Sequence, residues 1–126
     1  MRFITDRKRA EGLGSARRGV EHWWEQRVSA VTLAILAPLF VLPFAYHVGD
    51  GYEEAIRAYS HPVNALIAIA FITTMFLHLY QGLQVIIEDY VHDRFWEVVL
   101  LIAARLGCAL FGITGVFAIL KIAIGS

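Results

Sequence analysis

The sequence predicts an all-α integral membrane protein with three transmembrane helices. Residues 28–49 and 60–87 contain no Asp, Glu, Lys or Arg, and residues 98–120 contain only Arg105. Each segment is long enough to cross a bilayer core of about 30 Å, which takes roughly 20 apolar residues in a helix. In addition, 58% of the 126 residues are hydrophobic. A soluble bundle would need a polar face on each helix, whereas these segments are apolar nearly all round.

The distribution of positive charge predicts the orientation. Residues 1–27 form a basic tail before the membrane anchor, residues 28–126, and its cations are Arg2, Arg7, Lys8, Arg9, Arg17, Arg18 and Arg27. Arg94 lies in the second loop, whereas the other side of the membrane has only Arg57 and Lys121. The positive-inside rule therefore predicts a cytoplasmic N-terminus and a periplasmic C-terminus. Tryptophan is enriched at membrane–water interfaces, and the three tryptophans, Trp23, Trp24 and Trp96, all lie at this predicted cytoplasmic boundary.

The composition of the tail indicates the compartment. It has no apolar core and no small-residue cleavage pattern, so it is not a secretory signal. It is Arg-rich like a mitochondrial transit peptide but contains the acidic residues Asp6, Glu11, Glu21 and Glu25. We therefore predict a bacterial inner membrane protein in preference to a mitochondrial one.

Local signals place each helix in turn. The first spans about 28–48, with Pro38 and Pro43 expected to bend it and two glycines to end it. Glu53 and Arg57 are one helical turn apart, which is consistent with a short surface helix in the outer loop. The second spans about 61–88, with Ser60 as a possible cap and a proline in the first turn.

The third helix spans about 96–124 and carries a small residue at every fourth position. This stripe consists of Ala104, Cys108 and Gly112, and it permits close helix contact within the chain or with a partner. Cys108 is the only cysteine, so this chain alone offers neither a disulfide nor an iron–sulfur cluster.

The second helix carries the residues that indicate chemistry. His78, Gly82 and Asp89 share one face, because eleven residues at about 100° each return within about 20° of the start. The helical rise puts His78 about 16 Å from Asp89, near mid-bilayer. A histidine there must bond to a neighbouring helix, lie on a proton path or bind a metal. A bond to a neighbouring helix and a haem axial ligand both remain open, and the glycine leaves room for a flat ligand.

The other histidines lie at the two membrane edges and cannot reach an iron held by His78. A second imidazole ligand would therefore come from another chain.

At the end of the same helix, Tyr90 offers a phenol that can bond a quinone carbonyl, and Asp89 offers a carboxylate that can relay protons. An ordinary helix end with an interfacial tyrosine is the alternative. Arg105 either extends to the cytoplasmic side or pairs with an anionic group.

These spacings resemble a known family. His78-x3-Gly82 followed by Asp89-Tyr90, together with the segment LGSARRGVEHWWEQRVSAVTL, is similar to the D-type membrane anchor subunit of succinate dehydrogenase, respiratory complex II. With three helices and a matching length, the resemblance covers nearly the whole chain.

The resemblance implies roles for particular residues. His78 would be an axial ligand of haem b, and a C-type cytochrome b anchor subunit would supply the other ligand. Tyr90 and Asp89 would contribute to the ubiquinone site. His22 and Arg27 would lie near the haem propionates or the iron–sulfur subunit, and Gly82 would lie beside the haem.

Two functions are compatible with these residues. In the first, the chain anchors a flavoprotein and an iron–sulfur subunit to the lipid bilayer and helps to pass electrons from succinate to ubiquinone. It would not be an enzyme on its own, because it has neither a nucleotide-binding glycine turn nor the necessary cysteines. In the second, it is a small non-redox assembly or transport protein. A fumarate-reducing anchor is a further alternative, and no nucleic acid partner is expected.

Overall fold

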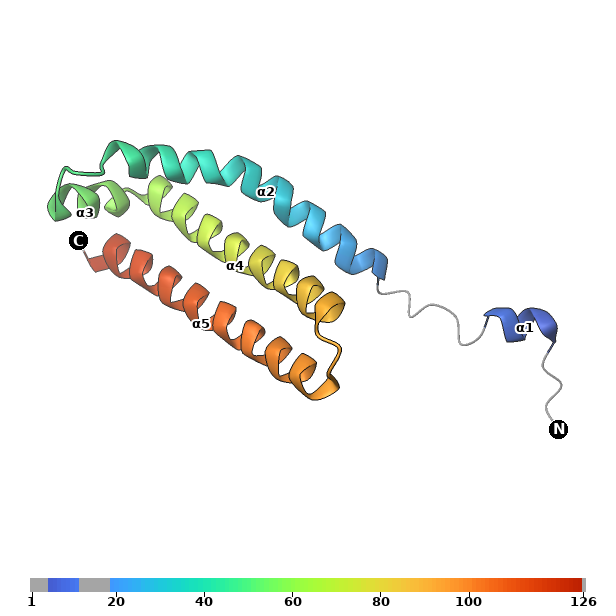
Figure 1. Cartoon of the computed structure of the whole chain (residues 1–126). Coiled ribbons are helices and arrows are strands. Elements are labelled where there is room, and N and C mark those ends of the chain that lie inside the picture. Colours follow the sequence, from blue (N-terminus) through green and yellow to red (C-terminus); the bar gives the residue numbers. More distant parts are fainter. Residues whose placement is uncertain (1–4, 12–18, 126) are drawn as a thin grey trace.

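A computed structural model of the chain describes residues 5–11 and 19–125, apart from the side chains of Lys8 and Glu11. The predicted tail cations Arg2, Arg17 and Arg18 lie outside the described residues. The described part forms helices α1 (Asp6–Glu11), α2 (Gly19–Tyr46), α3 (Tyr52–Ser60), α4 (Pro62–Tyr90) and α5 (Arg94–Gly125) (Figure 1).

Helices α2, α4 and α5 are long and apolar enough to cross a membrane, which confirms the three predicted spans. Helix α4 lies between the other two and contacts both, and consecutive long helices run in opposite directions (Figure 1). Helix α2 begins at Gly19, so the last nine residues of the predicted tail, 19–27, continue the first membrane helix. Both Pro38 and Pro43 lie within it.

The exposure of apolar side chains shows that this fold needs a surrounding apolar phase. Within the described part, the buried apolar side chains are Ala65, Ala68, Ile87 and Cys108. Large exposed apolar side chains occur along all three spans. In water such a surface would favour association, because apolar area left in contact with water is unfavourable by about 25 cal/mol per Å². Lipid or partner helices must therefore cover it.

Helices α4 and α5 pack through small residues of α5. A β-carbon built on Gly112 would lie 3.4 Å from Phe76 of α4, and one on Gly115 would lie 3.0 Å from Ile72. Cys108 is buried in the same contact region. The predicted small-residue stripe thus serves packing within the chain, where the absence of side chains lets the two backbones approach.

The loop between α2 and α4 forms the predicted short surface helix, α3, with one local correction. Arg57 pairs with Glu54 at 3.0 Å, one turn earlier in the same helix. Ser60 does not cap α4: it ends α3, and its hydroxyl donates to the carbonyl oxygen of Ile56 at 2.7 Å. His61 occupies the cap position without a side-chain hydrogen bond, and the proline is in the first turn as predicted. A serine hydroxyl often bonds back into its own helix in this way.

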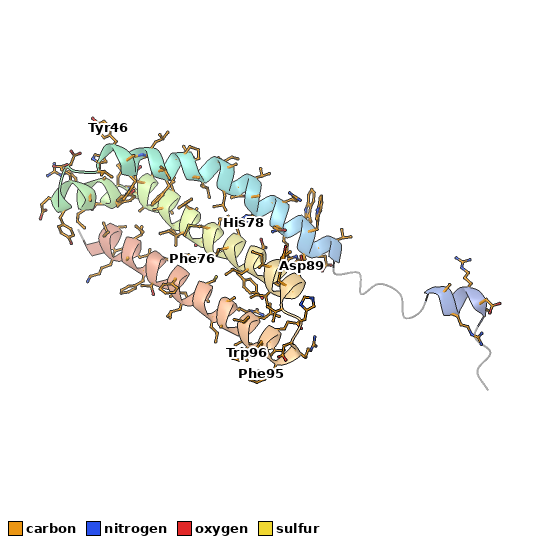
Figure 2. All side chains as sticks on the ribbon, viewed as in Figure 1. Tyr46, Phe76, His78, Asp89, Phe95 and Trp96 are labelled. Carbon is orange, nitrogen blue, oxygen red and sulfur yellow. The ribbon has the colours of Figure 1, made fainter. Side chains whose placement is uncertain are left out.

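Helix α3 covers the end of the helix layer at which α2 ends and α4 begins, and it contacts both α4 and α5. The ring of Tyr59 lies 6.1 Å from that of Phe40 in α2, which in turn stacks on Phe71 of α4 at 4.6 Å. Burial raises the pKa of the Tyr59 phenol, because the charged form loses hydration. These aromatic contacts join α2, α3 and α4 at the end of the molecule remote from Asp89 and Trp96 (Figure 2).

Candidate functional site

The half-buried His78 lies on the side of α4 that faces α2 (Figure 2). Its Nδ1 atom is 2.8 Å from Oγ of Ser29 in α2. Ser29 also contacts the carbonyl oxygen of Gln26 at 3.0 Å and Oε1 of Gln81 at 2.9 Å. The histidine therefore has the bond to a neighbouring helix that its position in the span requires.

The sequence analysis did not single out Ser29 or Gln81. Both are polar residues inside apolar segments, and Gln81 lies three positions after the histidine, on an adjacent part of the same helix. Their polarity within a membrane span was a usable signal. Their partnership depends on how α2 and α4 are aligned, and Ser29 is 49 residues from the histidine in sequence.

The second ring nitrogen of His78, Nε2, makes no hydrogen bond within residues 5–11 and 19–125. Gly82 lies one turn further along α4, and a β-carbon built there would meet nothing within 4 Å. A ring nitrogen without a hydrogen-bond partner beside open backbone fits a haem ligand, which needs one nitrogen for iron and space for a flat macrocycle. The residues present therefore fit the group that the sequence resemblance implied.

The described residues contain no group of three or more His, Cys, Asp or Glu side chains that could hold a metal ion. His47 pairs with Asp50 at 3.2 Å in the outer loop, and His92 contacts the carbonyl oxygen of Tyr90 at 3.1 Å at the other end. His78 is therefore a single potential ligand in the middle of its span.

Asp89 and Tyr90 form the last turn of α4, next to the start of α5. Both are exposed, Tyr90 at 76%, and neither side chain has a hydrogen bond or ion pair within the described part of the chain. Trp96 is exposed at the same end (Figure 2). Asp93, which the sequence analysis did not single out, accepts hydrogen bonds from the backbone amides of Phe95 and Trp96 and so caps α5. This cap fixes the turn that follows the exposed pair.

His22 and Arg27 occupy different sides of α2. Five residues correspond to about 140° around a helix, so the two side chains diverge. His22 has an enclosed Nε2 atom without a hydrogen-bond partner in the described part. The guanidinium of Arg27 lies 5.4 Å from the ring centroid of Trp23, a cation–π contact. The expectation that both residues lie near the haem propionates or the iron–sulfur subunit stays a prediction.

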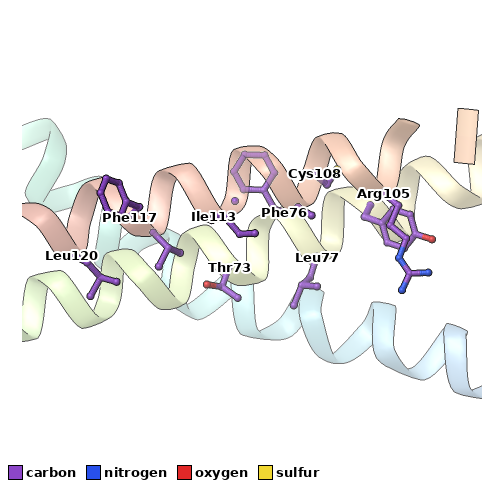
Figure 3. Close-up of a pocket in the computed structure, with 12 residues that line it drawn as sticks. Thr73, Phe76, Leu77, Arg105, Cys108, Ile113, Phe117 and Leu120 are labelled. Carbon is purple, nitrogen blue, oxygen red and sulfur yellow. The ribbon is translucent and has the colours of Figure 1, made fainter. Parts of the chain in front are cut away.

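A groove of about 590 Å³ lies between α4 and α5 (Figure 3). Phe76 and Tyr80, which line it, are each about 160° from His78 around α4, so the groove and the histidine are on different sides of this helix. Residues of both helices line the groove. Those labelled in the figure are Thr73, Phe76 and Leu77 of α4 and Arg105, Cys108, Ile113, Phe117 and Leu120 of α5. Tyr80 also lines it. Arg105 lines the groove and has no ion pair or hydrogen bond within residues 5–11 and 19–125.

Comparisons with known proteins agree with the geometry. The sequence profile described as succinate dehydrogenase/fumarate reductase transmembrane subunit matches residues 1–119. The chain is 34% identical to the succinate dehydrogenase hydrophobic membrane anchor subunit of Paracoccus denitrificans over 126 residues, which cover 100% of this chain and 97% of the relative. It is 31% identical over 90 residues to the succinate dehydrogenase membrane anchor subunit of Reclinomonas americana, covering 69% and 75% of the two chains.

A third relative, the succinate dehydrogenase hydrophobic membrane anchor subunit of Rickettsia bellii, is 30% identical over 105 residues, which cover 82% of this chain and 83% of the relative. No solved structure shows a significant match. Because the profile covers nearly the whole chain, and the Paracoccus relative is similar over its full length, the chain belongs to the family of succinate dehydrogenase/fumarate reductase transmembrane subunits.

Proposed function

We propose that this chain, a membrane anchor subunit of succinate dehydrogenase, co-ligates haem b through His78 and contributes Tyr90 and Asp89 to a ubiquinone site. The observation that carries the haem assignment is the environment of His78. One ring nitrogen is bonded to Ser29, the other is unbonded within the described residues, and Gly82 leaves open space one turn away. The names of the relatives favour this function over a non-redox membrane protein.

A bound haem supplies a one-electron carrier within the apolar phase. On this chain, His78 would hold its iron, and the missing side chain of Gly82 would leave room for its face. A second ligand to the iron would come from a C-type cytochrome b anchor subunit, since the other histidines of this chain lie towards the two ends of the membrane spans. Binding of the haem would then require both membrane subunits.

The end of α4 supports the quinone assignment. The exposed Tyr90 has a phenol that is free, within the described residues, to donate a hydrogen bond to a quinone carbonyl. Such a donor stabilises the negative charge that develops on the carbonyl oxygen during reduction. Asp89 is adjacent and also exposed, so its carboxylate can accept and release protons at the membrane boundary.

Docking would involve the end of the molecule that carries these residues. With the cytoplasmic N-terminus that the charge distribution predicts, Trp23, Trp24 and Trp96 would lie at the cytoplasmic face of a bacterial inner membrane. The flavoprotein and iron–sulfur subunits would bind there, with His22 and Arg27 near the iron–sulfur subunit or the haem propionates. The apolar sides of the spans would contact lipid and the second anchor subunit.

Purification of the intact complex tests the anchor assignment. A tagged chain is expressed in its own host, extracted in mild detergent, and its co-purifying subunits are identified by mass spectrometry. We expect a flavoprotein, an iron–sulfur protein and a second membrane subunit, with succinate oxidation coupled to reduction of a ubiquinone analogue. Recovery of the chain with none of these subunits would contradict the proposal. A tag that is accessible only from the periplasm when fused to the N-terminus would contradict the orientation.

A further inference from the structure

Ser29 is the polar residue through which α2 reaches His78. It lies in the apolar part of α2, is half-buried, and has three hydrogen-bond contacts. They join its Oγ atom to the carbonyl oxygen of Gln26 at 3.0 Å, to Oε1 of Gln81 at 2.9 Å and to Nδ1 of His78 at 2.8 Å. The question is which of these groups receives the single hydroxyl proton.

The carbonyl oxygen of Gln26 can only accept a hydrogen bond, and so can Oε1 of Gln81. If the proton pointed at His78 instead, the serine oxygen would lie 3.0 Å and 2.9 Å from two acceptor oxygens with no proton between them. The favourable arrangement sends the proton to one of these oxygens, and a lone pair of Oγ then faces Nδ1. Exchanging the amide O and N of Gln81 does not alter this result, because the Gln26 carbonyl still receives the proton.

This arrangement determines the tautomer of His78. Nδ1 must carry the hydrogen and donate it to Ser29, so Nε2 has no hydrogen and keeps its lone pair. In the opposite tautomer Nε2 would be protonated and could not bind iron. The bond also ties the ring of a residue on α4 to a residue on α2, which fixes its orientation relative to both helices.

We infer that Ser29 is a positioning residue that selects the Nδ1–H tautomer of His78 and orients its Nε2 towards haem iron. This inference rests on the proposed function, and it assigns Ser29 a role that does not require contact with haem or quinone. A ligating histidine usually donates its other ring N–H to an acceptor, which raises the basicity of the ligand. Loss of such an acceptor typically costs about 10–100-fold in metal affinity or activity.

The test uses the intact detergent-purified complex and compares Ser29→Ala with Ser29→Thr. We expect Ser29→Ala to weaken haem retention by about tenfold. The haem that remains should have altered low-spin g values and a higher midpoint potential, because a less basic ligand stabilises oxidised iron less. A tenfold change in the ratio of oxidised to reduced haem corresponds to about 59 mV for a one-electron couple. Ser29→Thr keeps the hydroxyl and should restore the wild-type spectrum and potential.

Thr32→Ala is the matched control. Thr32 lies on the same helix, and its hydroxyl donates to the carbonyl oxygen of Val28 at 2.9 Å without contacting His78. Its removal should leave the haem spectrum and potential unchanged. If Ser29→Ala does not assemble, Ser29→Cys retains most of the volume while replacing the oxygen with a weak acceptor, and it should shift the potential in the same direction.

Three results would overturn the inference. The first is haem with wild-type g values, potential and retention in Ser29→Ala, or in Ser29→Cys if the alanine variant does not assemble. The second is an equal shift in Thr32→Ala, which would indicate a general packing effect. The third is absence of haem b from the wild-type complex. Only this third result also removes the haem assignment in the proposed function, so the two failures are distinguishable.

Discussion

The side of α4 that faces α2 carries the polar contacts of His78, whereas the side that faces α5 carries close apolar packing at two glycines beside an apolar groove. On the first side, Ser29 and Gln81 surround His78, and Gly82 has no neighbour within 4 Å. On the second, the backbone at Gly115 approaches Ile72 so closely that a β-carbon would lie 3.0 Å away. The two glycines therefore have different roles. Gly115 lets α4 and α5 pack closely, whereas Gly82 leaves space for a group that is not part of this chain.

The largest effect in this comparison should come from the tyrosines, since Tyr90 is exposed at the polar end of α4 and Tyr80 lines the groove towards α5. Loss of one hydrogen-bond donor to a developing charge typically costs about 3 kcal/mol, roughly a hundredfold in rate. We expect Tyr90→Phe to slow succinate-dependent ubiquinone reduction by about this factor, with haem content and electron transfer to a soluble artificial acceptor unchanged.

Tyr80→Phe is the control and should retain near-normal turnover with both acceptors. Assays of the two purified variants with the two acceptors separate a quinone effect from a folding effect. A normal rate of ubiquinone reduction in Tyr90→Phe would show that this residue serves only to anchor the helix at the membrane boundary.

A smaller effect, on stability, is expected for the packed side. Gly115→Val places a branched side chain against Ile72, and overpacking of this kind typically costs about 1–3 kcal/mol. The midpoint temperature of the detergent-solubilised complex should fall. Gly107→Val provides the control, because a β-carbon at Gly107 meets nothing within 4 Å. Equal melting temperatures for the two variants would show that the α4–α5 contact is not the one described.

The smallest effect on stability is expected for the open side. In Gly82→Val the new side chain enters space without a neighbour in this chain, so the free energy of unfolding should change by less than about 0.5 kcal/mol, the scale of helix propensity differences. Haem retention should nevertheless fall, because the same space is assigned to the macrocycle. Thermal melting and pyridine haemochrome measurements on one preparation test both statements. Full haem retention in a stable Gly82→Val complex would place the haem elsewhere.

The three spans could be predicted from the sequence because charge is nearly absent from them, and hydropathy does not depend on tertiary contacts. The start of α2 at Gly19 could not be predicted in this way. Hydropathy locates the part of a helix that crosses the membrane, whereas α2 also includes the charged residues Glu21 to Arg27. The position of Ser60 at the end of α3 was similarly undetermined, because a serine hydroxyl can cap the next helix or bond back into its own.

The site was predictable in its main residue but not in its surroundings. A histidine in an apolar segment requires a partner wherever the other helices lie, so His78 was identifiable alone. Ser29 became a partner only through the register of α2 against α4, which no local pattern encodes.

The most direct test of the central claim is the reduced-minus-oxidised spectrum of the purified complex carrying His78→Ala, compared with wild type and with His92→Ala. His92 is exposed and contacts only the carbonyl oxygen of Tyr90 within the described residues, so its loss should leave haem unaffected. We predict a haem b band in wild type and in His92→Ala, and its loss or a clear change in position in His78→Ala, with the same subunits co-purifying. An unchanged haem b band in an assembled His78→Ala complex would contradict the assignment of this histidine as the iron ligand.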